Sequence, residues 1–236
     1  MPFLRIPVTL ATALAFHAAI TAPNPPLNDT MRTIKKTGFE VILVSHSFRE
    51  AQKLIFWVAT IAETAIILAQ LNTRSILAQR VISKLALGGG LPTTHLTPQL
   101  AFGSILVVAG AFLRIQCYRA LGKHFTFETS IARDHKLVTS GPYRYMRHPS
   151  YTGAAIVYLG LLCACSSPGS WFMECLFKGT TAGAVFCMSY AVAMGLVVFG
   201  LFFRMSREDE GLRREFGEKW KTWAATVPYV LVPGIY

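Results

Sequence analysis

Two polar segments of the chain carry side chains that could hold a charged small molecule. The first contains Arg144, Arg147 and His148 directly before Pro149. Proline is tolerated at the first position of a helix because its missing N–H would be unpaired there anyway, so we expect a helix to begin at Pro149. An N-terminal helix end carries partial positive charge, and cations around it favour an anionic group.

The second polar segment begins with Arg204 and contains Glu208, four residues later. If the preceding helix continues this far, the two side chains share one face and present one charge of each sign. Such a pair is most often only a solvated ion pair, and a basic cluster beside an apolar helix is most often a lipid anchor. Both interpretations stay open for each cluster taken alone.

The composition indicates which elements position these segments. Of the 236 residues, 53% are hydrophobic and only 15% are charged, whereas soluble domains carry about a quarter charged residues. This excludes a disordered chain and argues against an ordinary cytosolic enzyme. The net charge of +11 could indicate nucleic acid. Long uncharged stretches favour instead a membrane protein whose basic loops face anionic lipid, with no nucleic-acid partner.

Five apolar stretches are long enough, or nearly so, to cross a membrane as helices. We therefore expect an all-α, polytopic membrane protein with about five transmembrane helices, the last two forming a tight hairpin. The stretches are residues 6–28, with the helix ending near Ala22; 54–73; 85–113, with the helix starting near Leu96; 151–166; and 179–203.

The distribution of basic residues predicts the orientation. With a cytosolic carboxyl terminus, residues 30–53, 114–150 and 204–236 lie on the cytosolic side and hold 18 of the 23 basic residues. This agrees with the positive-inside rule, and the three basic residues between Arg74 and Lys84 are its weak point. Residues 1–22 are either a retained helix or a cleaved signal peptide, since Arg5 precedes the apolar run.

One carboxyl group and five cysteines lie in or near the apolar stretches. Glu63 interrupts the second stretch, where a charge costs roughly 2.5 kcal/mol or more, so it is expected to be functional or paired. No residue of the sequence identifies its partner. The cysteines show no metal-ligand spacing, and we interpret them as buried hydrophobic residues with no metal site.

The runs from His135 to Gly153 and from Arg204 to Gly217 together resemble the isoprenylcysteine carboxyl methyltransferase family. The shared features are His-x-Leu-Val-Thr-Ser-Gly-x-Tyr, then Arg-His-Pro-Ser-Tyr-x-Gly, then Arg-x-x-x-Glu-Asp, Phe-Gly, Trp-x-x-Trp and Val-Pro. The resemblance covers roughly residues 100–236. It implies a divergent part at 1–95 and a methyltransferase core at 96–236, with cofactor-binding segments at 124–153 and 204–223.

The resemblance implies an enzyme at the cytosolic face of the endoplasmic reticulum membrane. It would transfer a methyl group from S-adenosylmethionine to the carboxylate of a prenylated cysteine or another lipid-tailed acid. Arg204 matches the arginine near the substrate carboxylate. The residues that match cofactor-binding positions are Glu128, where the family tends to have Gln, and His135, Lys136, Leu137, Val138, Tyr143, His148, Pro149, Ser150, Tyr151 and Glu208.

Two other functions stay open. Sterol reductases, which use NADPH, share the Arg-His-Pro-x-Tyr-x-Gly hairpin and a tail like Val227-Pro228-Tyr229, but they are larger than this chain. A non-enzymatic membrane scaffold that binds anionic lipid would need only the basic loops. Saturable binding of S-adenosylmethionine, of NADPH or of neither distinguishes the three hypotheses.

Overall fold

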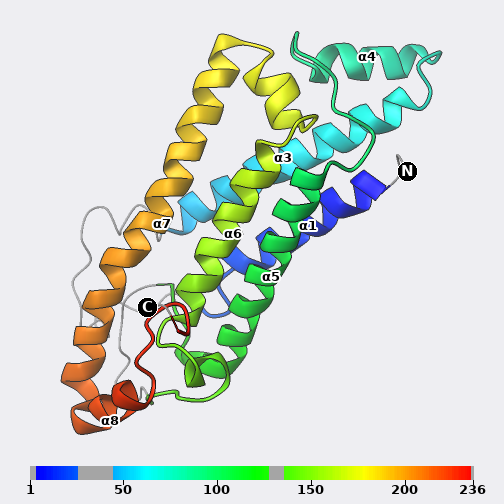
Figure 1. Ribbon diagram of the computed structural model, residues 1–236. Coiled ribbons are helices and arrows are strands. Elements are labelled where there is room, and N and C mark those ends of the chain that lie inside the picture. Colours follow the sequence, from blue (N-terminus) through cyan, green and yellow to red (C-terminus); the bar gives the residue numbers. More distant parts are fainter. Residues whose placement is uncertain (1–3, 26–44, 128–135, 235–236) are drawn as a thin grey trace. The chain divides into compact units, whose positions relative to one another are not determined.

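The computed structural model describes residues 4–25, 45–127 and 136–234. Within these ranges the chain forms helices and no strands, which confirms the all-α prediction. Three short helical turns join the longer helices: η3 (Gly122–His124), η4 (Gly141–Arg144) and the π-helix η5 (Phe172–Phe177). The α-helices of Figure 1 are α1 (Arg5–Ile20), α3 (His46–Gln70), α4 (Ile76–Leu85), α5 (Pro98–Leu121), α6 (Pro149–Cys165), α7 (Thr181–Phe216) and α8 (Glu218–Thr226).

Each of the five predicted apolar stretches overlaps a helix. By length and composition, α3, α5 together with η3, and α7 can cross a membrane, whereas α1 and α6 are apolar but shorter, at 16 and 17 residues. α6 begins at Pro149, as predicted, and α5 also has a proline, Pro98, at its first position. α4 has no counterpart among the predicted segments, because its ten residues include Arg80 and Lys84 and are too few for a membrane span.

The chain divides into two compact units, each made of three segments. Unit 1 comprises Met1–His17, Ala51–Val108 and Ile156–Leu196, and unit 2 comprises Ala18–Glu50, Ala109–Ala155 and Val197–Tyr236. The division near residue 96 rests on sequence resemblance and stays a prediction.

Close helix packing forms the interior of unit 1. α5 and α6 approach one another at Gly103 and Gly160, where a Cβ on either residue would lie 2.7 Å from the carbonyl oxygen of the other. Small residues permit such contact between membrane helices. Phe16 of α1 packs edge-on against Phe56 of α3 and Tyr158 of α6, with ring centroids 5.3 and 6.2 Å away.

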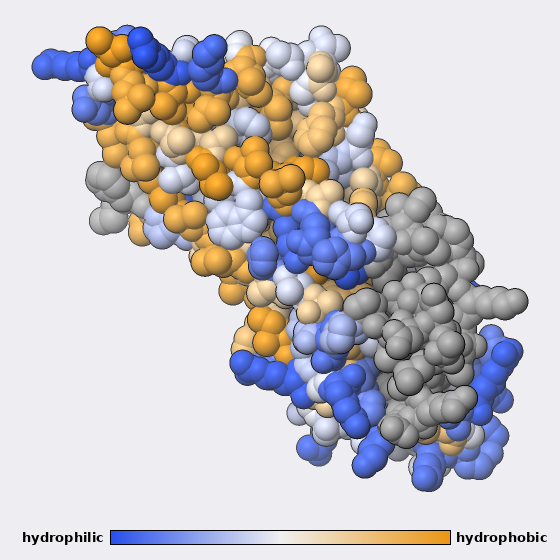
Figure 2. All heavy atoms as spheres, turned by 180° about the vertical axis from the view of Figure 1, so that it is seen from behind, coloured by the Kyte–Doolittle hydropathy of each residue, from blue (hydrophilic) through white to orange (hydrophobic). Residues whose placement is uncertain are grey.

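The two units differ in the chemistry of their surfaces. On the face that Figure 2 shows, apolar side chains predominate toward the α4 end, with hydrophilic side chains at the α4 edge, whereas the described side chains at the α8 end are mainly polar. Along α7, exposed apolar side chains include Val185, Val192 and Phe199. Contiguous exposed apolar surface of this kind fits contact with lipid.

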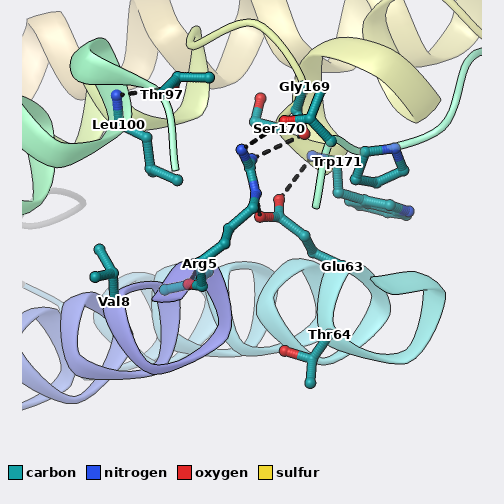
Figure 3. Close-up of polar contacts among 12 residues, drawn as sticks. Arg5, Val8, Glu63, Thr64, Thr97, Leu100, Gly169, Ser170 and Trp171 are labelled. Atoms are coloured by element: carbon teal, nitrogen blue, oxygen red, sulfur yellow. Dashed lines mark hydrogen bonds and ion pairs between the residues drawn. The ribbon is translucent and has the colours of Figure 1, made fainter. Parts of the chain in front are cut away.

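The partner of Glu63 is Arg5, which the sequence did not identify. In Figure 3 the two side chains extend toward one another from α3 and α1, and Arg5 Nε donates to Glu63 Oε1 at 2.8 Å. The backbone N–H of Trp171 donates to the other carboxylate oxygen, also at 2.8 Å. The carboxylate is therefore both paired and hydrogen-bonded, as a buried charge requires.

The same guanidinium group also fixes the connection between α6 and η5. Arg5 Nη2 donates to the carbonyl of Gly169 at 2.8 Å, and Nη1 donates to the hydroxyl of Thr93 at 3.0 Å. Gly169 has φ +78°, and a Cβ there would lie 2.2 Å from the Thr93 hydroxyl oxygen, so this turn requires glycine. One buried cation thus joins α1, α3 and the turn after α6.

Removing one charge of the Arg5–Glu63 pair should destabilise the protein strongly. Arg5→Met or Glu63→Leu leaves a buried charge without its partner and should lower the free energy of unfolding by about 3–5 kcal/mol. The double variant should lose less than the sum of the two single losses, because neither charge then stays buried alone. Thermal unfolding in detergent measures these differences.

The exposed Arg214–Glu210 pair supplies the control. Arg214→Met should change stability by no more than about 1 kcal/mol. Single losses at Arg5 and Glu63 that are as small as this, or strictly additive, would contradict a stabilising buried pair.

Candidate functional site

A buried arginine of α5 fixes the first turn of α6 in unit 2. Arg114 Nε donates to the carbonyl of Ala19 at 2.7 Å, and its Nη1 donates to the carbonyl of Ser150 at 2.9 Å. The side chain fits because position 153 is glycine: a Cβ at Gly153 would lie 2.8 Å from Arg114 Cγ and 3.0 Å from the carbonyl oxygen of Gly110. The first turn of α6 around Ser150 is therefore held in place by packing as well as by hydrogen bonds.

The carboxyl-terminal tail fixes the two residues before α6. The backbone N–H groups of Arg147 and His148 donate to the carbonyls of Tyr229 and Val230, each at 2.9 Å. Backbone groups next to a helix start are thus satisfied by a segment about 80 residues later in the chain. The side chains of Arg147 and His148 face the end of α7.

Acidic side chains near the end of α7 meet the start of α6. Because α7 continues to Phe216, Arg204 and Glu208 lie on one uninterrupted helix, as the spacing required. The Tyr151 hydroxyl donates to Glu208 Oε2. The next carboxylate, Asp209, lies 3.1 Å from His148 Nε2 and 3.5 Å from Arg147 Nη2. The anionic group at the N-terminal end of α6 is therefore the Asp209 carboxylate of the protein itself.

Tyr151 lies at the centre of this cluster. Its ring stacks on His148 with centroids 5.3 Å apart and planes 4° from parallel. The Arg204 guanidinium carbon lies 5.7 Å from the same ring, within the range of a cation–π contact. Arg204 is only 7% exposed, so the surrounding side chains restrict the orientation of its guanidinium group.

A second group of predicted residues packs beside α8. Tyr143 forms a buried cluster with Cys117, Trp223 and Val227, and Leu137 and Val138 are among the half-buried residues packed against it. Burial is the main cause that raises the pKa of the Tyr143 phenol well above its ordinary value, and the nearby Glu208 carboxylate raises it further. Tyr143 therefore stays protonated at neutral pH and keeps its O–H donor.

Four buried N–H groups in the described part of unit 2 have no acceptor. They are Arg147 Nε, Arg204 Nε, Trp220 Nε1 and Trp223 Nε1. Arg147 lies over the Trp220 ring at 5.8 Å, so these donors belong to the same region as Asp209 and Tyr151. Buried polar groups are normally hydrogen-bonded, and a set made only of donors suits a ligand rich in acceptor oxygens or nitrogens.

The structure brings most of the predicted site residues together. Lys136 is exposed. Pro149 and Ser150 form the start of α6, and the Ser150 carbonyl accepts from Arg114. Glu128 and His135 lie outside the described residues. The predicted residues that contact one another or share a buried cluster are Leu137, Val138 and Tyr143 in one group, and His148, Tyr151, Arg204 and Glu208 in the other.

Sequence reasoning did not assign a role to Asp209, Trp220 or Trp223. Asp209 directly follows Glu208 and so leaves the face shared by Arg204 and Glu208. Only the position of α6 shows that it faces His148. The Trp-x-x-Trp spacing places both indoles on one side of a helix, which was the available indication for Trp220 and Trp223.

Comparison with known proteins finds methyltransferases. Residues 98–185 match the family described as "Phospholipid methyltransferase". The chain is 32% identical to protein-S-isoprenylcysteine O-methyltransferase B of Arabidopsis thaliana, over 54% of this chain and 56% of the relative. It is 30% identical to protein-S-isoprenylcysteine O-methyltransferase A of the same plant, over 53% and 55%.

These matches confirm the resemblance stated from the motifs. The chain spans a little more than half the length of these plant relatives. A probable 7-dehydrocholesterol reductase of Acanthamoeba polyphaga mimivirus is also 30% identical, over 47% of this chain but only 21% of the relative.

A substitution that adds one methyl group at Gly153 tests the close approach of α6 to α5. Gly153→Ala should lower the free energy of unfolding by about 1–3 kcal/mol, because the added carbon meets Arg114 and the backbone of α5. Gly195→Ala on α7 is the matched control, since a Cβ there has no neighbour within 4 Å, and it should leave stability unchanged or raise it by up to about 1 kcal/mol. Equal unfolding temperatures for the two variants in detergent would contradict the packing at Gly153.

Proposed function

We propose that this protein transfers a methyl group from S-adenosylmethionine to the carboxylate of a lipid-tailed acid, such as a prenylated cysteine, at a membrane. The observation that carries the proposal is the set of unpaired buried N–H donors beside the carboxylates of Glu208 and Asp209. The methyltransferase names of the plant relatives support the same reaction class.

The charges of unit 2 fit those of the cofactor. Its ammonium group needs an anionic partner, which Glu208 supplies. Its carboxylate needs donors, and we assign it to Arg147, whose Nε has no acceptor among the described residues, with the adjacent His148 beside it. Its purine has several acceptor nitrogens, and the unpaired indole N–H groups of Trp220 and Trp223 are suitable donors. We assign Tyr143 to the adenosyl side of the site, because it packs with Trp223.

The reaction needs orientation more than proton transfer. S-adenosylmethionine supplies an electrophilic methyl group on a sulfonium. A carboxylate acceptor is already ionised, so the new O–CH₃ bond can form as the S–CH₃ bond breaks without a general base. The protein then contributes alignment and exclusion of water. We assign the acceptor carboxylate to Arg204, whose Nε has no acceptor among the described residues and whose charge offsets the desolvation of the acid.

The lipid tail explains why such an enzyme would be built from membrane helices. Each CH₂ group of a chain contributes about 0.8 kcal/mol to partitioning into hydrocarbon, so a prenylated acid approaches through the bilayer. The excess of basic residues on the segments that form unit 2 supports a cytosolic orientation for the site. By family resemblance we place the enzyme in the endoplasmic reticulum.

Glu208→Gln tests the cofactor assignment. It removes the charge from a contact with the ammonium group and should weaken S-adenosylmethionine binding about ten- to hundredfold. Calorimetry or equilibrium dialysis in detergent measures the Kd. Glu210→Gln is the matched control, because Glu210 lies two residues away on the same helix and forms an exposed pair with Arg214.

The same binding measurement separates the alternatives. The parent should bind S-adenosylmethionine saturably and should not bind NADPH. Binding of NADPH alone would support a reductase and contradict the proposal, and binding of neither cofactor would support a scaffold. Unchanged affinity in Glu208→Gln would remove Glu208 from the site.

Arg204→Ala tests the acceptor assignment. With the guanidinium removed, kcat/KM for a lipid-tailed acid should fall roughly ten- to hundredfold, whereas the Kd for S-adenosylmethionine should change little. Arg213→Ala, at an exposed position of the same helix, should leave both quantities at the parental value. An Arg204→Ala variant with parental turnover at all substrate concentrations would show that Arg204 does not hold the acceptor.

A further inference from the structure

A hollow in unit 1 lies outside the groups that we assign to methyl transfer. It is bounded by the end of α6, by η5 and by the first turns of α7, and it forms a partly open cavity of about 160 Å³. An apolar cavity of about 150 Å³ in another protein stays free of water and binds a small apolar molecule, so this volume can hold one end of a lipid. Its lining is mainly apolar, with Leu161, Cys165, Phe172 and Met188 among the contributors, and includes no Asp, Glu, Lys or Arg.

The hydroxyl of Tyr190 is the polar group on which specific binding in this hollow would depend. The residue lines the hollow, and its hydroxyl is buried without a hydrogen-bond partner in the described part of the chain. The ring is held between Phe172 and Phe186, stacked on each with centroids 6.0 and 6.1 Å away. The hydroxyl therefore cannot readily turn toward solvent, and a buried hydroxyl without a partner is unfavourable.

Two other polar side chains of the lining, Ser166 and Cys187, already have hydrogen-bond partners. The Ser166 hydroxyl donates to the carbonyl of Cys163 and accepts from Gln99, and the Cys187 thiol donates to the carbonyl of Phe172. A resident water needs two to four polar partners, and the Tyr190 hydroxyl offers too few. The missing partner of Tyr190 is thus expected on a molecule that is otherwise apolar.

The lining also selects against charged lipids. A phospholipid headgroup or a free acid would find no counter-ion here, and burying an unpaired charge is costly. A hydrocarbon chain alone would fill the hollow but leave the Tyr190 hydroxyl unpaired. A neutral lipid with one hydroxyl group satisfies both requirements.

We propose that this hollow binds a neutral lipid that carries a single hydroxyl group, with its chain against η5 and α7 and its hydroxyl hydrogen-bonded to Tyr190. The source is the bilayer, because the hollow is formed partly by α7, the least buried of the three helices long enough to span a membrane. The proposal is independent of methyl transfer and goes beyond it.

Photolabelling of the full chain in detergent tests this site. The probes are hexadecanol and hexadecane, each with a diazirine at the same end of the chain, so that they differ only in the hydroxyl group. Mass spectrometry of the digested protein locates the label. Hexadecanol should label residues 161–194 about two- to tenfold more than hexadecane does, the range expected for one hydrogen bond, and excess unlabelled hexadecanol should remove the difference.

Two variants distinguish the contribution of the Tyr190 hydroxyl to probe binding from that of the space in the hollow. Tyr190→Phe removes only an unpaired hydroxyl, so the fold should persist and the preference for the alcohol should disappear. Ala191→Trp places an indole at an exposed position of the lining and should abolish labelling of the hollow by both probes. Val192→Trp is the matched control, because Val192 is the adjacent exposed residue and does not line the hollow; it should label like the parent.

Each outcome decides the proposal. Equal labelling by the two probes in the parent, or a preference that survives in Tyr190→Phe, would show that Tyr190 does not bind the hydroxyl. Labelling that persists in Ala191→Trp at the level of Val192→Trp would show that the probes coat the outer surface of α7 and do not enter the hollow.

Discussion

The buried pair of Arg5 and Glu63 is the interaction on which the arrangement of unit 1 depends. Two charges inside an apolar helix bundle are tolerated only when their hydrogen-bonding groups are matched. Here the guanidinium donates to Glu63, Thr93 and the Gly169 carbonyl, and the carboxylate also accepts the N–H of Trp171. The turn after α6 therefore has one position that satisfies both charges, and α1 and α3 define it.

Unit 2 also holds buried polar groups, and several of them have no partner among the described residues. Arg114 donates to the carbonyls of Ala19 and Ser150 and so holds the start of α6, but Arg147, Arg204 and two tryptophans each keep a side-chain N–H with no acceptor in the described part of the chain. A protein interior retains such donors at a free-energy cost, and a ligand that supplies acceptors recovers it. The same principle that explains the stability of unit 1 therefore supports a binding role for unit 2.

The sequence predicted the features that depend on local chemistry. Pro149 identified the start of α6, and the spacing of Arg204 and Glu208 required the continuous α7 that is observed. Features that depend on distant contacts could not be predicted. Glu63 was expected to be paired, but its partner is 58 residues away, and the contact of Asp209 with His148 spans 61 residues. Helical periodicity carries no information about which helices meet at such distances.

We propose that unit 2 esterifies a carboxylate that is attached to a lipid. The most direct test is transfer of the radiolabelled methyl group of S-adenosylmethionine by the purified protein to N-acetyl-S-farnesylcysteine, with N-acetylcysteine as the acceptor lacking a lipid. We predict a base-labile methyl ester on the farnesylated acid and none on the acid without a lipid. Absence of the ester from a protein that binds the cofactor, or equal methylation of both acids, would contradict methyl transfer to a lipid-tailed acid.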